Sequence, residues 1–315
     1  MNEKDIIEYF ISQQQCDSVA YGIGDDCAIL NPTPGCQLVT TTDTMIEGRH
    51  FVKQAPAYAV GYKLMAVNLS DIAAMGAIPK WATLNLSLRQ FDQAWIKDFS
   101  NGLLECANKH NVTIVGGDTT RGDQLILSLQ LLGEIPLGSA TLRNQAQIND
   151  VIYVTGTIGC AAAALRILEE NKFLHSALNQ TQTSALYMPP SRVELAQALR
   201  EYIRASIDIS DGLLHELEII CHQSHVGAIL MLENIPVSKD MDVMQSITAG
   251  DDYELLFTAD VQYVETIAEL ASSHHCAITA IGNIVNSQGI KLTMNQQEVT
   301  YPNISGYDHF LDNHE

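Results

Sequence analysis

Ala-Val-Asn-Leu-Ser-Asp-Ile-Ala-Ala-Met-Gly-Ala, residues 66–77, is the stretch of sequence that most constrains how this chain folds. Apolar residues across 57–75 recur with helical spacing and predict a long helix with one buried stripe. Gly76 then ends the helix, as glycine often does at a helix C-terminus. Asp71 stands among apolar neighbours, where an unpaired carboxylate is costly to bury. It therefore lies either on an exposed helix face or beside a group that needs its charge.

Strands and helices alternate on both sides of this helix. Residues 81–88 alternate between apolar and polar side chains, which predicts a half-buried strand. Other strands are expected at 27–30, 38–42, 113–115, 124–132, 151–155, 206–210 and 252–258, and other helices at 93–109, 160–170, 189–202 and 213–221. This mixture indicates an α+β or α/β protein. The turn-rich stretch 133–150 lacks periodicity, so we divide the chain into domains over 1–137 and 138–315.

Short aspartate-bearing segments stand at the ends of several apolar runs. They are Gly24-Asp25-Asp26, Thr41-Thr42-Asp43-Thr44, Asn68-Leu69-Ser70-Asp71, Gly116-Gly117-Asp118-Thr119-Thr120 and Asp208-Ile209-Ser210-Asp211-Gly212. Two carboxylates 4 Å apart repel by about 4 kcal/mol at an effective dielectric near 20. A fold that gathered these segments would need a cation between them, and Mg²⁺ prefers such oxygen ligands.

Each segment also has an ordinary structural interpretation. Ser210 or Asp211 could cap the helix that starts at residue 213. The glycine-aspartate pair at 117–118 could form a hairpin turn. Residues 251–254, Asp-Asp-Tyr-Glu, could be a solvated loop, and His50 could have a purely structural role. The single segments therefore leave both interpretations open.

The charge of the chain restricts its partners. It has 17 Lys+Arg against 37 Asp+Glu, a formal net charge of −20. This balance argues against nucleic acid or an anionic membrane as the main partner. A phosphate-bearing ligand would need metal ions to supply positive charge. The sequence has no G-x-x-x-x-G-K-[ST] loop and no G-x-G-x-x-G, so a phosphate enzyme here would be built on aspartates and metal.

The cysteines and the N-terminal residues bear on the compartment. Seven cysteines are scattered along the chain, and none forms a C-x-x-C pair. This favours reduced thiols in a cytoplasmic protein over a disulfide framework or a zinc site. Residues 1–10 carry four charges and do not form the apolar core of a signal peptide. No stretch is long and apolar enough to suggest a membrane span.

Taken in order, the segments closely resemble bacterial thiamine-monophosphate kinases. The matching stretches run from about residue 20 to 310 and include 22–28, 42–44, 66–77, 116–122, 153–157, 207–213, 252–255 and 306–310. The resemblance implies the two-domain α+β fold of the aminoimidazole ribonucleotide synthetase-like superfamily, with helices packed on mixed sheets. It also implies a homodimer paired through the N-terminal sheets. The implied reaction is the phosphorylation of thiamine monophosphate by ATP to give thiamine diphosphate.

The resemblance assigns roles residue by residue. The implied Mg²⁺ ligands are Asp26, Thr41, Thr42, Asp43, Asp71, Asp118, Asp208 and Asp211. The implied nucleotide contacts are Gly117, Asp118, Arg143 and Ser210. His50, Asp251 and Tyr307 match substrate-binding positions. Because the acceptor is already an anionic phosphate oxygen, we expect direct in-line transfer with several Mg²⁺ ions, without a general base.

Two departures from the family pattern concern the substrate side. The family often has glutamate where this chain has Asp251, which is one methylene shorter. Relatives also often have a tryptophan before the terminal Gly-Tyr-Asp-His-Phe, where this chain offers Tyr301 or Tyr307 as the aromatic contact.

Other functions are separated by particular residues. Selenophosphate synthetase, in the same superfamily, needs a reactive N-terminal cysteine or selenocysteine with a lysine, a setting that Cys16 lacks. The hydrogenase-maturation carbamoyl dehydratase ends in a functional cysteine, whereas this chain ends Asn313-His314-Glu315. A non-catalytic acidic protein that binds metal or nucleotide would bind ATP without releasing ADP.

Overall fold

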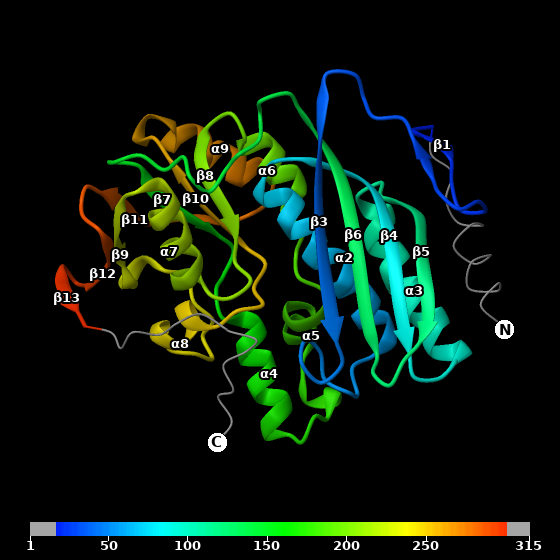
Figure 1. Ribbon diagram of the computed structural model, residues 1–315. Coiled ribbons are helices and arrows are strands. Elements are labelled where there is room, and N and C mark those ends of the chain that lie inside the picture. Colours follow the sequence, from blue (N-terminus) through cyan, green and yellow to red (C-terminus); the bar gives the residue numbers. More distant parts are fainter. Residues whose placement is uncertain (1–16, 301–315) are drawn as a thin grey trace. The chain divides into compact units, whose positions relative to one another are not determined.

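The computed structural model describes residues 17–300 (Figure 1). The chain forms two compact units. Unit 1 takes the residues up to Ile72, then Ala77–Ala140 and Tyr187–Val193. Unit 2 takes Ala73–Gly76, Thr141–Leu186 and the residues from Glu194 onward.

Unit 1 is built on a four-stranded sheet. Its strand order is β3 (Cys36–Ile46), β6 (Ile126–Pro136), β4 (Ile78–Leu88) and β5 (Thr113–Arg121). The pairs β3/β6 and β6/β4 are antiparallel, and β4/β5 is parallel. A parallel pair needs a crossover connection, and helix α3 (Gln93–Lys109) provides it. Strands β1 (Val19–Tyr21) and β2 (Ile29–Leu30) form a separate small ladder.

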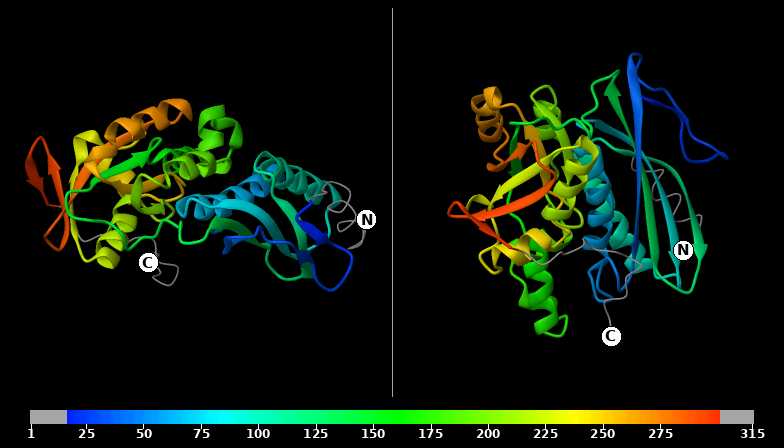
Figure 2. Two further views of the ribbon diagram at one scale, coloured as in Figure 1. Left: turned by 90° about the horizontal axis from the view of Figure 1, so that it is seen from above. Right: turned by 60° about the vertical axis from the view of Figure 1, so that its left-hand side comes forward.

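Helices α2 (Ala57–Ala74) and α3 cover one face of this sheet (Figures 1 and 2). The two helices come very close to each other. A Cβ atom on Gly102 of α3 would lie 1.9 Å from the carbonyl oxygen of Tyr58 on α2. Trp81 and Phe99 are fully buried in the core of the unit. The sheet therefore buries its apolar face under a closely packed helix pair.

Two predictions about the acidic segments of unit 1 are wrong. Strand β3 extends to Ile46, so Asp43 lies inside the strand and not at its end. Strand β5 runs through residues 116–120, so Gly117-Asp118 does not form a hairpin turn. Strand β3 has 11 residues and β5 has 9. Each continues past its polar residues because its backbone pairs with a neighbouring strand there. The helix predicted at 93–109 is confirmed.

Unit 2 contains a seven-stranded mixed sheet. Its order is β13 (Gln297–Val299), β12 (Gly289–Met294), β9 (Gly227–Met231), β11 (Ile278–Val285), β7 (Val151–Thr155), β10 (Leu255–Ala259) and β8 (Ile203–Asp208). The β12/β9 pair is parallel, and the other pairs are antiparallel. The predicted strand at 151–155 is confirmed. The strand predicted at 206–210 ends at Asp208, which leaves Ser210 in a loop.

The helices of unit 2 are α4 (Cys160–Glu170), α5 (Gln180–Tyr187), α6 (Val193–Leu199), α7 (Leu213–Ser224), α8 (Val243–Thr248) and α9 (Val264–Ser273). The helix predicted at 189–202 is thus shorter than expected, because the residues after Pro190 are not yet helical. Both faces of the central strands are covered. Leu256 belongs to the core cluster that contains residues of α7, while Phe257 stacks on Tyr153 with ring centroids 5.3 Å apart. Strand β10 is accordingly buried along its whole length, and Thr258 is its one polar residue.

Within residues 17–300 no helix has the length and apolarity that a membrane crossing requires. None of the six cysteines in this part of the chain forms a disulfide. The expected reduced thiols are therefore compatible with the structure.

The contact between α2 and α3 yields a stability prediction. Gly102→Ala places a Cβ against the Tyr58 carbonyl and should lower the free energy of unfolding by about 1–3 kcal/mol, the usual cost of overpacking. Gly22→Ala is the control, because its Cβ would meet only the Val19 side chain at 3.5 Å. Urea unfolding followed by circular dichroism measures both. Equal stability of the two variants would contradict the close helix contact.

Candidate active site

Asp43 on β3 and Asp71 on α2 bring two carboxylates together in unit 1. The hydroxyl of Thr41 donates a hydrogen bond to Asp71 Oδ2. Asp43 Oδ2 is buried and has no hydrogen-bond partner. Since buried polar atoms are normally satisfied, an orphaned carboxylate oxygen points to an absent ligand. The Asp71 interpretation that places it on an exposed helix face is wrong, because Asp71 lies against β3 and is only partly exposed.

Electrostatics at this pair favour a bound cation. Burial and, to a smaller extent, the negative charge of Asp71 together raise the pKa of Asp43 to about 7. A hard divalent cation would remove both unfavourable effects, since it supplies opposite charge and takes oxygen ligands. The donor set of Asp43, Asp71 and the Thr41 hydroxyl therefore suits Mg²⁺.

Thr42 does not point into this site. Side chains alternate between the faces of a strand, and Thr41 and Asp43 face α2. The intervening row faces the other way: Gln130 donates to Thr40 at 3.3 Å, and Thr44 bonds Ser128 at 2.8 Å. Thr42 pairs with Gln130 and is exposed. As a metal ligand it could therefore contribute its backbone carbonyl but not its hydroxyl alongside Asp43.

A cavity of about 550 Å³ in unit 1 gathers a second group of predicted site residues. Its lining includes Asp25 and Asp26 from one loop and Gly116, Gly117 and Asp118 from β5. Asp26 and Asp118 are both exposed to solvent. The cavity is large enough for a small-molecule ligand, and its acidic lining would need a cation before it could accept a phosphate.

Gly117 gives this cavity its backbone shape. Its φ is +151°, and a Cβ atom there would lie 1.8 Å from the carbonyl oxygen of Leu84 on β4. Only glycine fits at that place. The missing Cβ therefore lets β4 and β5 approach each other closely, and the Gly117 backbone forms part of the cavity lining.

In unit 2, Ser210 and Asp211 lie in the loop that begins α7. The side chain of Glu216, on the first turn of α7, accepts from the Ser210 hydroxyl and from the Asp211 amide, each at 3.2 Å. Burial raises the pKa of Glu216, and the Asp211 amide opposes that rise. Glu216 thus fixes the loop at the start of the helix. Neither Ser210 nor Asp211 is the side-chain cap of α7, whose N-cap is Gly212.

Asp208 and Asp251 flank the same loop. Asp208 is the last residue of β8 and is 4 % exposed. Asp251 lies close to this loop, because its amide donates to the Ser210 carbonyl at 2.7 Å. The strand predicted at 252–258 begins only at Leu255. The structure therefore brings together four predicted site residues of unit 2: Asp208, Ser210, Asp211 and Asp251.

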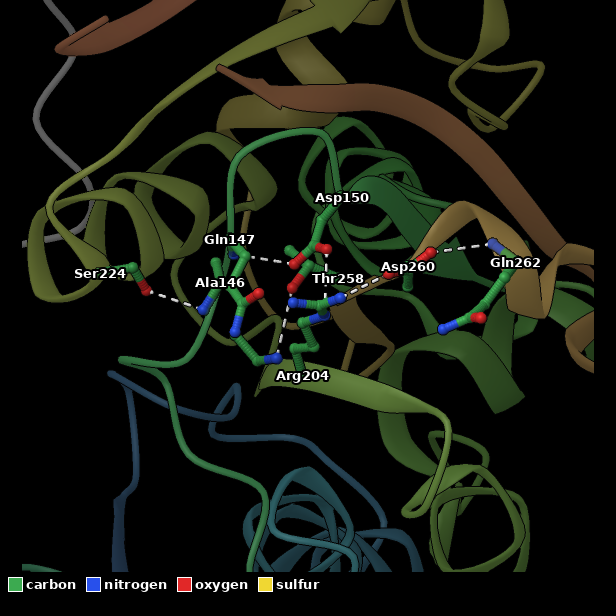
Figure 3. A network of polar contacts seen from close by, with 9 residues as sticks. Ala146, Gln147, Asp150, Arg204, Ser224, Thr258, Asp260 and Gln262 are labelled. Atoms are coloured by element: carbon green, nitrogen blue, oxygen red, sulfur yellow. Dashed lines mark hydrogen bonds and ion pairs between the residues drawn. The ribbon is translucent and has the colours of Figure 1, made fainter. Parts of the chain in front are cut away.

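Arg143 is exposed, and the residues that follow it in the chain belong to a network of polar contacts (Figure 3). The hydroxyl of Ser224, at the end of α7, donates to the Arg143 carbonyl at 3.2 Å and accepts from the Ala146 amide at 3.1 Å. Farther along, Asp150 accepts from the Gln147 amide at 2.8 Å and pairs with Arg204 at 3.2 Å. These contacts fix the start of the Arg143 side chain while leaving its guanidinium accessible.

His50 follows β3 and is held by its ring. Its Nδ1 accepts from the Ile46 amide at 3.0 Å, so a neutral ring carries its proton on Nε2. Tyr301 and Tyr307 lie outside the described residues.

The acidic residues do not form a complete metal cage by themselves. Among residues 17–300, no three or more His, Cys, Asp or Glu side chains are grouped closely enough to hold a metal ion. The pair at Asp43 and Asp71 and the cavity at Asp26 and Asp118 are separate features of unit 1. Phosphate oxygens or water would have to complete the coordination of any ion bound there.

Three buried acids were not predicted as functional or structural residues. Glu216 holds the Ser210 loop, Asp252 bonds the Gly159 amide, and Glu254 accepts from Thr155. Asp252 and Glu254 stand beside Asp251 in the sequence, but acidic runs of this kind are usually solvated. Their burial depends on strands and helices far away in sequence, so no local pattern could have revealed it.

The whole chain is similar to known proteins. Residues 24–135 match the family described as AIR synthase related protein, N-terminal domain, and residues 147–295 match its C-terminal domain. A thiamine-monophosphate kinase of Buchnera aphidicola subsp. Acyrthosiphon pisum is 38 % identical over 97 % of each chain. The crystal structure of a thiamine-monophosphate kinase from Stenotrophomonas maltophilia K279a is 38 % identical, with a TM-score of 0.84 over 94 % of this chain and 96 % of that one. A structure of AaThiL complexed with AMPPCP and TMP is 25 % identical, with a TM-score of 0.77 over 98 % and 99 %.

The raised pKa of Asp43 predicts a pH-dependent stability of the metal-free protein. An unfolded aspartate ionises near pH 4, whereas folded Asp43 ionises near 7. The folded state retains a proton between these values, so stability falls as pH rises from about 4 to 7 and the loss is complete above 7. Asp43→Asn should therefore stabilise the metal-free protein at pH 8 by about 1–3 kcal/mol, with little effect near pH 4.

Thermal unfolding with a chelator present measures this difference. Asp98→Asn, an exposed change on α3, is the control and should leave stability unchanged at both pH values. An Asp43→Asn variant that is less stable than the wild type at pH 8 would show that protein donors, and not a cation, satisfy this carboxylate.

Proposed function

Because the chain belongs to the AIR synthase related protein family and, within it, to the thiamine-monophosphate kinases, we propose that it transfers the γ-phosphoryl group of ATP to thiamine monophosphate. The product is thiamine diphosphate. The similarity covers nearly the full length of the relatives, and one solved relative is named as a complex with AMPPCP and TMP. The observation within this chain that carries the proposal is the orphaned carboxylate oxygen of Asp43 beside Asp71.

The negative charge of the substrates explains why the proposed site contains acidic side chains, which can hold cations, and few basic ones. ATP and a phosphate monoester are both strongly anionic, and 17 Lys+Arg stand against 37 Asp+Glu in the chain. Bound Mg²⁺ would neutralise the phosphate oxygens and the developing charge of the transferred group. Asp43, Asp71 and the Thr41 hydroxyl would hold one such ion. Asp26 and Asp118 would contribute from the cavity lining.

The protein residues then bind and orient the substrates. Gly117 and Asp118 are the proposed nucleotide contacts of unit 1, and Ser210, held by Glu216, is a proposed nucleotide contact of unit 2. Arg143 would add one of the few positive charges, on a backbone fixed by Ser224. Asp208 and Asp211 are the proposed metal ligands of unit 2, and His50, Asp251 and Tyr307 are the proposed contacts of thiamine monophosphate.

The transfer itself needs little acid–base chemistry. The acceptor oxygen belongs to a phosphate that is already ionised at neutral pH, so no residue has to remove a proton from it. Positioning and charge neutralisation are then the main sources of rate. We infer direct in-line transfer with no phosphorylated protein intermediate.

We also propose that the protein is a homodimer that pairs through the sheet of unit 1. The face of this sheet opposite α2 and α3 exposes Thr40, Thr42 and Thr44 in a row. Leu38, on the same row, is 51 % exposed. A strand row with small polar side chains and one large exposed apolar residue is suited to packing against a second copy.

One assay tests the function. The purified protein is incubated with Mg²⁺-ATP and either thiamine monophosphate or free thiamine, and products are separated by chromatography. We expect thiamine diphosphate and ADP in equal amounts from the monophosphate, and no turnover of free thiamine. ATP binding without ADP release would instead support the non-catalytic alternative.

Substitutions in unit 1 test the metal site. Asp43→Asn, Asp71→Asn and Asp118→Asn each keep the size of the side chain but remove its charge. Each should lower kcat by about 100-fold or more, since they remove charge that acts on the transferred phosphoryl group. The unfolding temperature of each variant should stay close to that of the wild type. Asp98→Asn serves again as the surface control, and near-normal rates in all three variants at ordinary Mg²⁺ would refute the metal site.

A further inference from the structure

The segment that carries Asp251 has an unusual backbone. Asp251 and Tyr253 both have positive φ, 74° and 53°, although neither is glycine. Side chains disfavour this left-handed region, and residues held there tend to occur where surrounding structure forces the conformation. Two such residues within three positions indicate that residues 250–254 are held firmly by their neighbours.

Backbone hydrogen bonds join this segment to the loop before α7. The Asp251 amide donates to the Ser210 carbonyl at 2.7 Å, and the Tyr253 amide donates to the Ile209 carbonyl at 2.8 Å. In return the Ile209 amide donates to the Glu254 carbonyl at 2.8 Å. These backbone hydrogen bonds join the two loops in the way that two paired strands are joined. Asp252 lies between the two left-handed residues.

The side chain of Asp252 fastens this segment to α4. Its Oδ2 accepts from the Gly159 amide at 2.8 Å, and Asp252 is only 6 % exposed. Gly159 is the N-cap of α4 and has no side chain of its own to cap the helix. Asp252, 93 residues away in sequence, thus supplies the capping carboxylate at the positive end of the helix. Burial raises the pKa of Asp252 to about 7, and the amides of Gly159 and Ala161 oppose that rise.

A second acid anchors the other end of the segment. Glu254 is 4 % exposed, and its Oε2 accepts from the Thr155 hydroxyl at 2.5 Å. The same hydroxyl accepts from the Leu255 amide at 2.8 Å. Asp252 therefore points inward to α4, and Glu254 points inward to β7. A solvated acidic loop would leave both carboxylates in water.

We propose that Asp252 is a positioning residue for thiamine-phosphate binding: by capping α4 from a distance it holds the strained backbone that presents Asp251. This inference rests on the proposed function, in which Asp251 contacts thiamine monophosphate. The neighbouring nucleotide contact Ser210 and metal ligand Asp211 have their own support, because Glu216 on α7 fixes both. Loss of the Asp252 anchor should therefore weaken the binding of thiamine monophosphate much more than the binding of ATP.

The kinetic test uses Asp252→Asn and Asp252→Ala. The asparagine variant keeps one acceptor for the Gly159 amide but loses the charge, whereas the alanine variant loses the cap. We expect the KM for thiamine monophosphate to rise by about tenfold or more in the alanine variant and by less in the asparagine variant. The KM for ATP should stay within about twofold of the wild-type value. Asp92→Ala, which removes the N-cap of α3 in unit 1, is the control for losing a cap alone and should change neither KM.

A double-mutant cycle tests whether Asp252 acts through Asp251. If it does, Asp252→Ala should add little to the KM of an Asp251→Ala protein. A purely structural role would lower the fraction of folded enzyme and therefore kcat. It would not raise the KM for thiamine monophosphate more than the KM for ATP. Equal rises in both KM values, unchanged KM values, or additive effects with Asp251→Ala would each overturn the proposal.

Hydrogen exchange separates the failure of this inference from failure of the proposed function. In Asp252→Asn, the amides of residues 251, 253 and 159 should exchange faster than in the wild type, while those of β10 keep their protection. If the wild-type protein makes no thiamine diphosphate, the proposed function fails, and unchanged exchange at these amides would independently refute the anchor.

Discussion

The repulsion between the partly buried carboxylates of Asp43 and Asp71 is the constraint on which the rest of unit 1 depends. The strand β3 and the helix α2 could have buried apolar side chains at these two positions at no electrostatic cost. They place two acids there instead, one of them with a buried oxygen, and the pKa of Asp43 rises to about 7 as a result. The fold tolerates this because the sheet and the helix pair around it are closely packed, down to the glycine contact between α2 and α3. A stable frame thus holds a locally unstable pair, which is the arrangement that a cation-binding site requires.

The buried acids of the described chain fall into two kinds, separated by the groups that satisfy them. Asp252 and Glu216 face backbone amides at helix starts, and Asp150 faces both an amide and Arg204. These carboxylates are used to join distant segments. Asp43 Oδ2 has no hydrogen-bond partner, and neither has Asp252 Oδ1, although the other Asp252 oxygen accepts from the Gly159 amide. Asp43 differs because it stands beside a second carboxylate, Asp71, so that a cation would relieve both its burial and its repulsion. In so acidic a chain the composition alone cannot separate structural acids from ligand-binding acids, but the donors and charges around each one can.

The sequence predicted the elements better than the placement of the acids. Long periodic helices such as 93–109 and short apolar strands such as 151–155 have the predicted bounds, because their pattern reflects local burial. The polar side chains around Asp43 and Gly117 predict strand ends, but pairing with neighbouring strands extends both strands past these residues. The opposite orientations of Thr41 and Thr42 follow once the strand is known to continue. The roles of Asp252, Glu254 and Glu216 could not have been predicted, since each depends on a partner brought close by the tertiary fold.

The left-handed backbone at Asp251 also bears on why this chain has aspartate where its family often has glutamate. Aspartate is among the few residues other than glycine that occupy the left-handed region with modest strain, since its short side chain can bond locally. The lost methylene shortens the reach toward a substrate, while the backbone conformation becomes easier to hold. The position of the carboxylate then depends more on the backbone than on side-chain flexibility. This makes the anchoring of residues 250–254, by Asp252 at α4 and Glu254 at β7, more consequential here than it would be behind a longer side chain.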